Sequence, residues 1–218
     1  MKDFKNSSLN PKLNIKPEYI NELFDYLKSI TDLNHVIFEQ LKEKLTGHFA
    51  VGYPIIHRQG HVSQKCWFVN SGMVIAYSYD HSRHIAAHTI FKAGEIALIP
   101  DSFMTNNPSK DNLIACPDTQ LIEISREQVQ HMHDHFPETE RLAKLIIAHQ
   151  MGKVRRRDAL LRYKGKERIQ QFFQLFPQVR HKEIKLMDRL SASYLMITEP
   201  SFSRLLKKIG KDNPELEK

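Results

Sequence analysis

The chain has few cysteines and no long hydrophobic run. Two of its 218 residues are cysteine, Cys66 and Cys116, which is too few for an iron–sulfur cluster held by cysteine alone. Both lie in apolar, strand-like runs typical of reduced, buried thiols. No window approaches the roughly 18 apolar residues that span a membrane, and the N-terminal residues lack the apolar run of a secretory signal. We therefore expect a cytoplasmic protein that has no membrane partner.

Acidic residues are scarce at one end of the chain. Residues 1–140 contain 13 Lys and Arg against 17 Asp and Glu, a net charge of −4, whereas residues 141–218 contain 19 against 8, a net charge of +11. A mildly acidic body joined to a strongly basic C-terminal part indicates a polyanionic partner for that part. Nucleic acid is the polyanion that this pattern favours.

Hydrophobic periodicity divides the chain into parts. Residues 17–46 have the apolar spacing of helices, and from Gly47 short β-branched or aromatic runs alternate with Gly, Pro, Asn and Asp. Such runs are typical of an all-β barrel or jelly roll. Helical spacing returns at Pro137. We predict an α+β protein with an N-terminal β-roll and its leading helices over residues 1–136, a long helix over 137–163 and a small helical domain over 164–218.

Residues 188–207, DRLSASYLMITEPSFSRLLK, have the pattern of two short helices joined by a tight turn. Ala192 is small where two crossing helices would touch. Thr198 is a suitable N-cap for the second helix, and Pro200 falls in its first turn, where a missing N–H costs no helical hydrogen bond. The apolar positions that can close over one another are Leu195, Ile197, Phe202 and Leu205.

The second helix of this helix-turn-helix pattern has a basic face. Its cationic residues recur at helical spacing, and hydrogen-bonding side chains at its leading end can meet base edges or phosphates in a major groove. The alternative is an ordinary amphipathic terminal helix with a solvated basic face. The predicted DNA-binding residues are Thr198, Glu199, Ser201, Ser203, Arg204, Lys207 and Lys208.

The long helix has more apolar surface than one flank of a small barrel needs. Its apolar residues are Leu142, Leu145, Ile146, Ile147, Met151, Val154 and Leu161. Either they all pack on their own domain, or some face a second copy of the chain. We expect a homodimer, which would present two helix-turn-helix units to half-sites about one DNA turn apart. The predicted dimer contacts are Leu142, Leu145, Ile146, Met151 and Val154.

Four segments carry a family resemblance: HRQGHVSQKCWFVNSGMV, FKAGEI, LIEISREQVQHMHDHFPE and ASYLMITEPSFSR. These segments and the order of the elements resemble the Crp/Fnr superfamily of bacterial transcription regulators. The last is most similar to the corresponding helices of members without a known ligand. The resemblance implies a cyclic-nucleotide-binding-type β-roll, a dimerisation helix and a C-terminal winged helix-turn-helix that binds palindromic promoter DNA.

The cyclic-nucleotide motif of that family is incomplete in this chain. The resemblance implies that a Gly-Glu pair, matched by Gly94 and Glu95, works with a later arginine that neutralises the cyclic phosphate. The arginine position falls in residues 107–111, NPSKD, where Lys110 is a poor substitute for a bidentate donor. We expect no response to cyclic AMP or cyclic GMP, and we expect Glu95 to accept hydrogen bonds from turn amides. The candidate effector pocket is Gly94, Glu95 and Lys110.

Twelve histidines raise the question of haem or another metal. The segment that contains His131, His133 and His135 precedes Pro137 and is expected to be a short helix, in which side chains at i and i+2 point in different directions. The group of His81, His84 and His88 spans an expected hairpin. We predict no metal site and no cofactor. The three groups are His57 and His61; His81, His84 and His88; and His131, His133 and His135.

The helix-turn-helix departs from the family pattern at its turn. Met196 replaces the usual glycine, which is tolerated if its φ angle stays negative. Glu199 and Pro200 invert the usual order, so that the family's glutamate contact to cytosine is lost unless Glu199 reaches the base. Eight residues follow Gly210, and any wing is therefore expected within residues 178–186.

Together these features predict a dimeric DNA-binding transcription regulator, not an enzyme, with a β-roll that senses an unidentified small-molecule effector. Two alternatives stay open. A cupin-like metal-dependent β-barrel enzyme would use a His-rich jelly roll, although His57 and His61 have no Glu nearby in the sequence. A regulator with a ligand-free β-roll would instead be controlled by a protein partner.

Overall fold

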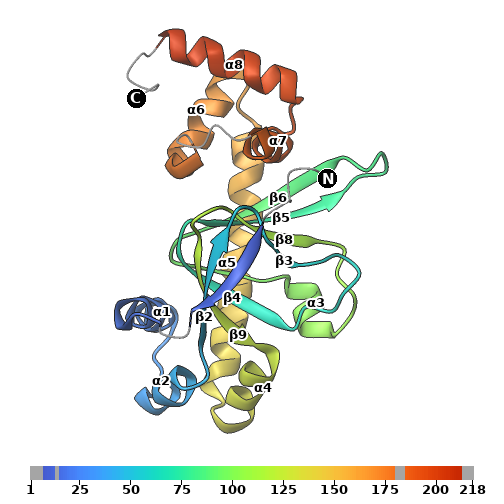
Figure 1. Ribbon diagram of the computed structural model, residues 1–218. Helices are drawn as coiled ribbons and strands as arrows, with labels where there is room; N and C mark the ends of the chain where they lie inside the picture. The colour runs from blue at the N-terminus through green and yellow to red at the C-terminus, as the bar shows by residue number, and fades with distance from the viewer. Residues whose placement is uncertain (1–6, 13–14, 180–184, 213–218) are drawn as a thin grey trace. The chain divides into compact units, whose positions relative to one another are not determined.

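A computed structural model describes residues 7–12, 15–179 and 185–212 (Figure 1). The strands are β1 (Ser8–Lys12), β2 (Thr46–Val51), β3 (Ile55–His57), β4 (Lys65–Ser71), β5 (Met73–Tyr79), β6 (Ile85–Lys92), β7 (Glu95–Ala97), β8 (Asn112–Ala115) and β9 (Gln120–Ser125). The helices are α1 (Pro17–Ile30), α2 (His35–Lys42), α3 (Pro100–Thr105), α4 (Arg126–His135), α5 (Glu138–Leu161), α6 (Gly165–Leu175), α7 (Lys185–Tyr194) and α8 (Glu199–Asp212). The α+β prediction is confirmed.

The strands form two sheets. One has the order β1-β2-β9-β4-β7 and the other the order β3-β8-β5-β6. Successive side chains of β4 point to opposite faces of the first sheet, and both of these faces are buried. Trp67 and Val69 belong to the core between the sheets, whereas Cys66 and Phe68 belong to a core on the opposite face. That second core is completed by apolar residues of α1, α2 and α4.

The chain forms two compact units. The first comprises residues 1–76 and 90–150, and therefore most of the β-roll and the first half of α5. The second comprises residues 77–89, which include the β5–β6 turn, and residues 151–218. Its core is built from α6, α7 and α8, with Phe172 ringed by Phe173, Phe176 and Tyr194 at centroid distances of 5.3 to 5.8 Å.

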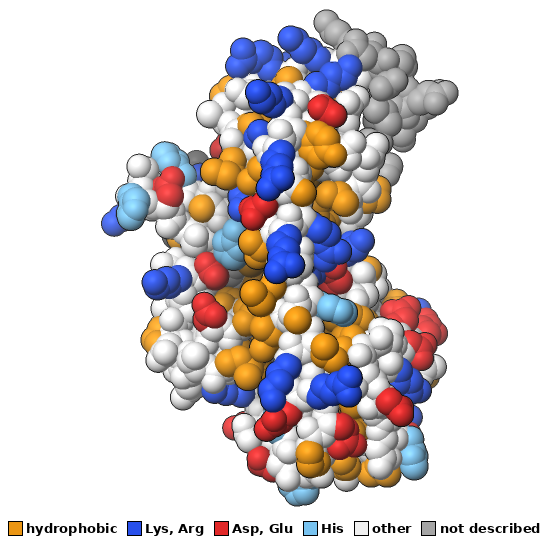
Figure 2. All heavy atoms as spheres, turned by 180° about the vertical axis from the view of Figure 1, so that it is seen from behind, with side chains coloured by type: hydrophobic (Ala, Val, Ile, Leu, Met, Phe, Trp, Pro, Cys, Tyr) orange, Lys and Arg blue, Asp and Glu red, His pale blue; other side chains and the backbone are white. Residues whose placement is uncertain are grey.

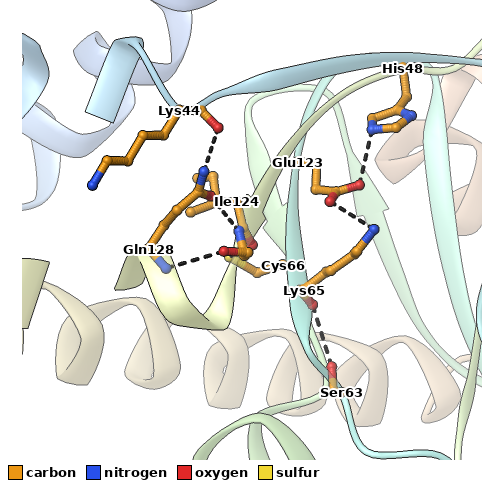
Figure 3. Close-up of polar contacts among 9 residues, drawn as sticks. Lys44, His48, Ser63, Lys65, Cys66, Glu123, Ile124 and Gln128 are labelled. Atoms are coloured by element: carbon orange, nitrogen blue, oxygen red, sulfur yellow. Dashed lines mark hydrogen bonds and ion pairs between the residues drawn. The ribbon is translucent and has the colours of Figure 1, made fainter. Parts of the chain in front are cut away.

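Local sequence signals position the helices. Ser125 and Gln128 form a capping box at α4, in which Ser125 Oγ accepts from the Gln128 N–H at 3.1 Å and Gln128 Oε1 accepts from the Ser125 N–H at 2.6 Å (Figure 3). Gln128 also donates to the carbonyl oxygen of Lys44. These contacts tie the start of α4 to the end of the α1–α2 region. The short helix expected around the three histidines is confirmed as α4.

Both cysteines are buried, as expected. Burial raises the pKa of the Cys66 thiol to about 12, so this thiol stays protonated and unreactive at neutral pH. None of the helices in the described ranges combines the length and hydropathy that crossing a membrane requires.

Candidate functional site

The helix-turn-helix lies in α7, α8 and the turn that joins them. Ala192, Leu195 and Phe202 are almost fully buried, which confirms their expected packing role. The Ile197 N–H donates to the carbonyl oxygen of Ala192 at 3.0 Å, and the Leu195 N–H donates to that of Ser191 at 3.0 Å. The backbone therefore closes the end of α7 before the chain turns into α8.

Thr198 caps the second helix. Its hydroxyl oxygen accepts from the Ser201 N–H at 3.3 Å, and its hydroxyl donates to Ser201 Oγ at 2.9 Å. The N-cap prediction is confirmed, and α8 begins one residue later at Glu199. The cap orders the leading end of α8, where the predicted base-reading side chains lie.

The face of α8 opposite its buried side is polar and basic. Phe202 and Ile209 are buried, whereas Ser203, Arg204, Lys207 and Lys208 are exposed. One Arg204 Nη atom lies 3.5 Å from Ser201 Oγ. The guanidinium is thus placed beside the capped end of the helix and keeps further N–H donors for an external acceptor.

Glu199 is engaged within the protein. Its carboxylate lies 3.4 Å from the Nε of Arg189 on α7. This pairing holds the glutamate against the first helix of the motif. Glu199 is therefore a weaker candidate for a base contact than Arg204.

The condition of a negative φ at Met196 is not met. Met196 has a φ angle of +53° and a side chain that is 69% exposed. The turn therefore requires the left-handed conformation that glycine adopts without strain, and Met196 adopts it at a cost.

Replacing Met196 by glycine is expected to stabilise the C-terminal unit by about 0.5–1 kcal/mol, because the left-handed strain is relieved and little buried surface is lost. The Met196→Ala variant keeps a Cβ atom and should not gain stability. Chemical denaturation of both variants measures the difference. Equal stabilities for the two variants would contradict strain at this turn.

Two arginines attach the helix-turn-helix to the end of α5. Arg168 on α6 donates to the carbonyl oxygens of Tyr163 at 2.7 Å, Leu161 at 2.8 Å and Leu195 at 2.9 Å. Arg157 donates to the carbonyl oxygen of Tyr194 at 3.0 Å, and its guanidinium lies 5.1 Å from the centre of the Tyr194 ring. Neither role was predicted from the sequence, because the acceptors are backbone atoms that leave no sequence signal.

Arg168→Ala is expected to destabilise the C-terminal unit by about 2–3 kcal/mol, because three carbonyl oxygens at two chain turns lose a charged donor. Arg162→Ala, at an exposed position on the same unit, is the matched control and should change stability by less than about 0.5 kcal/mol. Thermal unfolding followed by circular dichroism compares them. A midpoint for Arg168→Ala equal to that of the control would remove Arg168 from this role.

Ser193 joins α7 to the β5–β6 hairpin. Its hydroxyl donates to the carbonyl oxygen of Ile85 at 2.7 Å and accepts from the N–H of Ala87 at 2.9 Å. One side chain thus satisfies two backbone groups of β6. Sequence reasoning missed this contact, although a serine beside buried Ala192 and Tyr194 is a weak signal for such a bond.

The predicted dimer contacts fall into two groups. Leu142 and Ile146 pack against the core of the β-roll, and Leu145 is partly buried. Met151 and Val154 are 62% and 54% exposed. With partly buried Ile147, these two recur at spacings of four and three residues, which places them on one face of α5. Figure 2 shows hydrophobic side chains along this helix, bordered by Lys and Arg.

The predicted effector residues lie in different places. Gly94 and Glu95 form the turn before β7, where Gly94 N–H donates to the Val69 carbonyl oxygen and Glu95 accepts from the Lys92 N–H at 2.9 Å. This confirms Glu95 as an acceptor for a turn amide. Lys110 is exposed and follows Ser109, whose backbone bonds to Gly60 and His61. None of the three residues lines the pocket at the start of β4.

The pocket at the start of β4 has a volume of about 330 Å³ and is lined by residues of β3, the following loop and β4. His57 and His61 are both part of its lining, and the lining contains no Asp or Glu. A cupin-type metal centre needs a carboxylate beside paired histidines, so this histidine pair does not match that alternative.

The other histidine groups are spread along α4 and the β5–β6 hairpin. In α4, His131 and His135 stack at 4.2 Å, while His133 lies beside Thr139. Within the described ranges, no three His, Cys, Asp or Glu residues are grouped closely enough to hold a metal ion. The predicted wing falls largely on residues 180–184, which lie outside the described residues.

Neither a protein-family model nor a curated protein matches this sequence. Solved structures do match. A putative Crp/Fnr-family transcriptional regulator from Eubacterium rectale has a TM-score of 0.67 at 16% identity, over 86% of this chain and 88% of that one. FixK2 from Bradyrhizobium japonicum has a TM-score of 0.62 at 17% identity, over 77% and 85%.

The regulator CLP from Xanthomonas campestris is described as responsive to c-di-GMP. It has a TM-score of 0.60 at 15% identity, over 82% of this chain and 93% of that one. At these identities the likeness concerns the fold. This chain has the fold of the Crp/Fnr-type regulators, in which a β-roll is followed by a long helix and a helix-turn-helix.

Proposed function

We propose that this protein is a homodimeric transcription regulator that binds double-stranded DNA through α8. The observation that carries the proposal is the capped, outward-facing basic side of α8, with Arg204, Lys207 and Lys208 exposed. The fold shared with Crp/Fnr-type regulators supports it. So does the net charge of +11 over residues 141–218.

Phosphate contacts would supply most of the affinity. Lys207 and Lys208 end in flexible ammonium groups, which suit sequence-independent phosphate binding. Arg204 and Ser201 lie at the capped end of the helix and would carry sequence preference. Two copies joined through Ile147, Met151 and Val154 would read a palindromic promoter site.

The β-roll would serve as the regulatory part. Residues 107–111 contain no arginine, and the exposed position of Lys110 gives no enclosed partner for a cyclic phosphate. We therefore propose a regulator that does not respond to cyclic AMP. A ligand could bias the helix-turn-helix through α5, whose end is attached to it by Arg157 and Arg168.

A salt titration tests the DNA-binding proposal. Fluorescence anisotropy with a random-sequence duplex should give an affinity that falls steeply as salt rises, and the Lys207→Gln/Lys208→Gln double variant should reduce the slope of log K against log salt by about two. An Arg141→Gln variant, which removes an exposed charge from the first half of α5, should leave the slope unchanged. Absence of binding at low salt would overturn the proposal.

A further inference from the structure

The pocket at the start of β4 combines an apolar floor with a cationic rim. Ile56, Val62 and Trp67 supply apolar surface, whereas Arg58, His61 and Lys65 supply polar, basic groups. Its volume of about 330 Å³ is at the lower end of the range of small-molecule sites. Arg58 and His61 are exposed at the rim, so an incoming molecule can reach them.

Trp67 gives the floor an unsatisfied donor. The residue is only 2% exposed, and its indole Nε1 has no hydrogen-bond partner among the described residues. The same is true of Nε2 of His57, which also lines the pocket. Buried polar atoms without partners are uncommon, and a bound ligand or water is one explanation for them.

The carboxylate that contacts Lys65 of the pocket is already paired. Glu123 Oε1 lies 2.7 Å from Lys65 Nζ, and Oε2 lies 3.0 Å from His48 Nε2 (Figure 3). Burial acts to raise the pKa of Glu123, but the hydrogen bonds from His48 and Lys65 outweigh it and hold the pKa below its usual value. Glu123 is thus an ionised group whose two carboxylate oxygens are engaged by His48 and Lys65.

The rim of the pocket has a cationic side chain that is not used in an ion pair. No salt bridge to Arg58 is found within the described residues. Burial and the neighbouring His61 lower the pKa of His57, with Asp111 acting in the opposite direction. His57 is therefore neutral at physiological pH, and Arg58 is the main fixed charge available to a ligand.

We propose that this pocket binds a small organic carboxylate with an aromatic or alicyclic body. The carboxylate would be held by Arg58 and His61, and the apolar body would lie against Ile56, Val62 and Trp67. Inorganic phosphate fits less well, because it has no apolar surface to place against the floor. This assignment does not depend on DNA binding.

The chain contains a built-in reporter for the test. Trp67 is its single tryptophan, so emission excited selectively in tryptophan, and not in the tyrosines, reports on the pocket. Phenylacetate, benzoate and cyclohexanecarboxylate are titrated into the full-length protein, with phenylacetamide and inorganic phosphate as controls. At least one carboxylate should change the emission saturably, and the two controls should not.

Matched variants locate the carboxylate. Arg58→Gln should raise the dissociation constant about tenfold, the scale of one charge-assisted hydrogen bond, whereas Arg141→Gln should leave it unchanged. Both positions are exposed, and circular dichroism confirms that the variants fold. The carboxylate titration and the salt titration with DNA are separate measurements. Either proposal can therefore fail while the other stands.

Three results would overturn the assignment. The first is no saturable change with any of the three carboxylates up to about 10 mM, which is tenfold above a dissociation constant of about 1 mM. The second is an equal response to phenylacetamide or phosphate. The third is an equal loss of affinity, or no loss, in Arg58→Gln and Arg141→Gln.

Discussion

Arg204→Ala is expected to weaken binding to the preferred DNA site by about 1–3 kcal/mol, roughly 5- to 150-fold, and to relax base preference at one position of each half-site. Arg204 is exposed on α8, and its contact with Ser201 uses one Nη atom at 3.5 Å. The remaining donors can form a bidentate contact with guanine. Anisotropy measurements with the preferred duplex and single-base variants, at one fixed salt concentration, quantify both effects.

Lys208→Ala is the informative comparison for Arg204→Ala. Lys208 lies further along the same face of α8 and is exposed. Its loss should weaken binding to preferred and random duplexes by the same factor and lower the salt slope by about one. If Arg204→Ala also weakens both duplexes equally, Arg204 is a phosphate contact and does not read sequence.

Val154→Asp is expected to raise the dissociation constant of the proposed homodimer at least about 100-fold, because two-fold symmetry would place two unpaired carboxylates in one apolar interface. The side chain is 54% exposed in the single chain, so the monomer should keep its stability. Sedimentation equilibrium over a range of concentrations measures the association. Affinity for a palindromic site should fall together with dimerisation.

Ala159→Asp is the control for Val154→Asp. It introduces the same charge at an exposed position of α5, about 140° around the helix from Val154 at 100° per residue. Dimerisation should be retained. If Val154→Asp also remains dimeric, the contact between the two copies lies elsewhere and the role given to Ile147, Met151 and Val154 is wrong.

Local signals in the sequence predicted much of the architecture. The long helix was expected over residues 137–163 and is Glu138–Leu161, because Pro137 and the apolar spacing that follows are both local features. The cap at Thr198 was predicted for the same reason. Strand β1 was not predicted: Ser8–Lys12 contains a proline and little alternation, and it is a strand because it pairs with β2. Long-range pairing of this kind leaves no local pattern.

The site was less predictable than the fold. Apolar spacing along α5 could not distinguish Leu142 and Ile146, which pack on the β-roll, from exposed Met151 and Val154. The sign of φ at Met196 depends on how α7 and α8 meet. The pocket around Trp67 depends on β3 and β4 lying in different sheets. Each of these features is set by tertiary packing.

The central claim is that the protein binds specific DNA sites through α8. Selection of bound fragments from genomic DNA tests this claim most directly. The purified full-length protein is incubated with sheared genomic DNA of its own source at moderate salt, and the retained fragments are sequenced. The DNA-binding account predicts enrichment of a palindromic motif whose half-sites lie about one helical turn apart, with the enrichment lost in Arg204→Ala. Retained fragments with the same composition as the input, or no retained DNA, would contradict it.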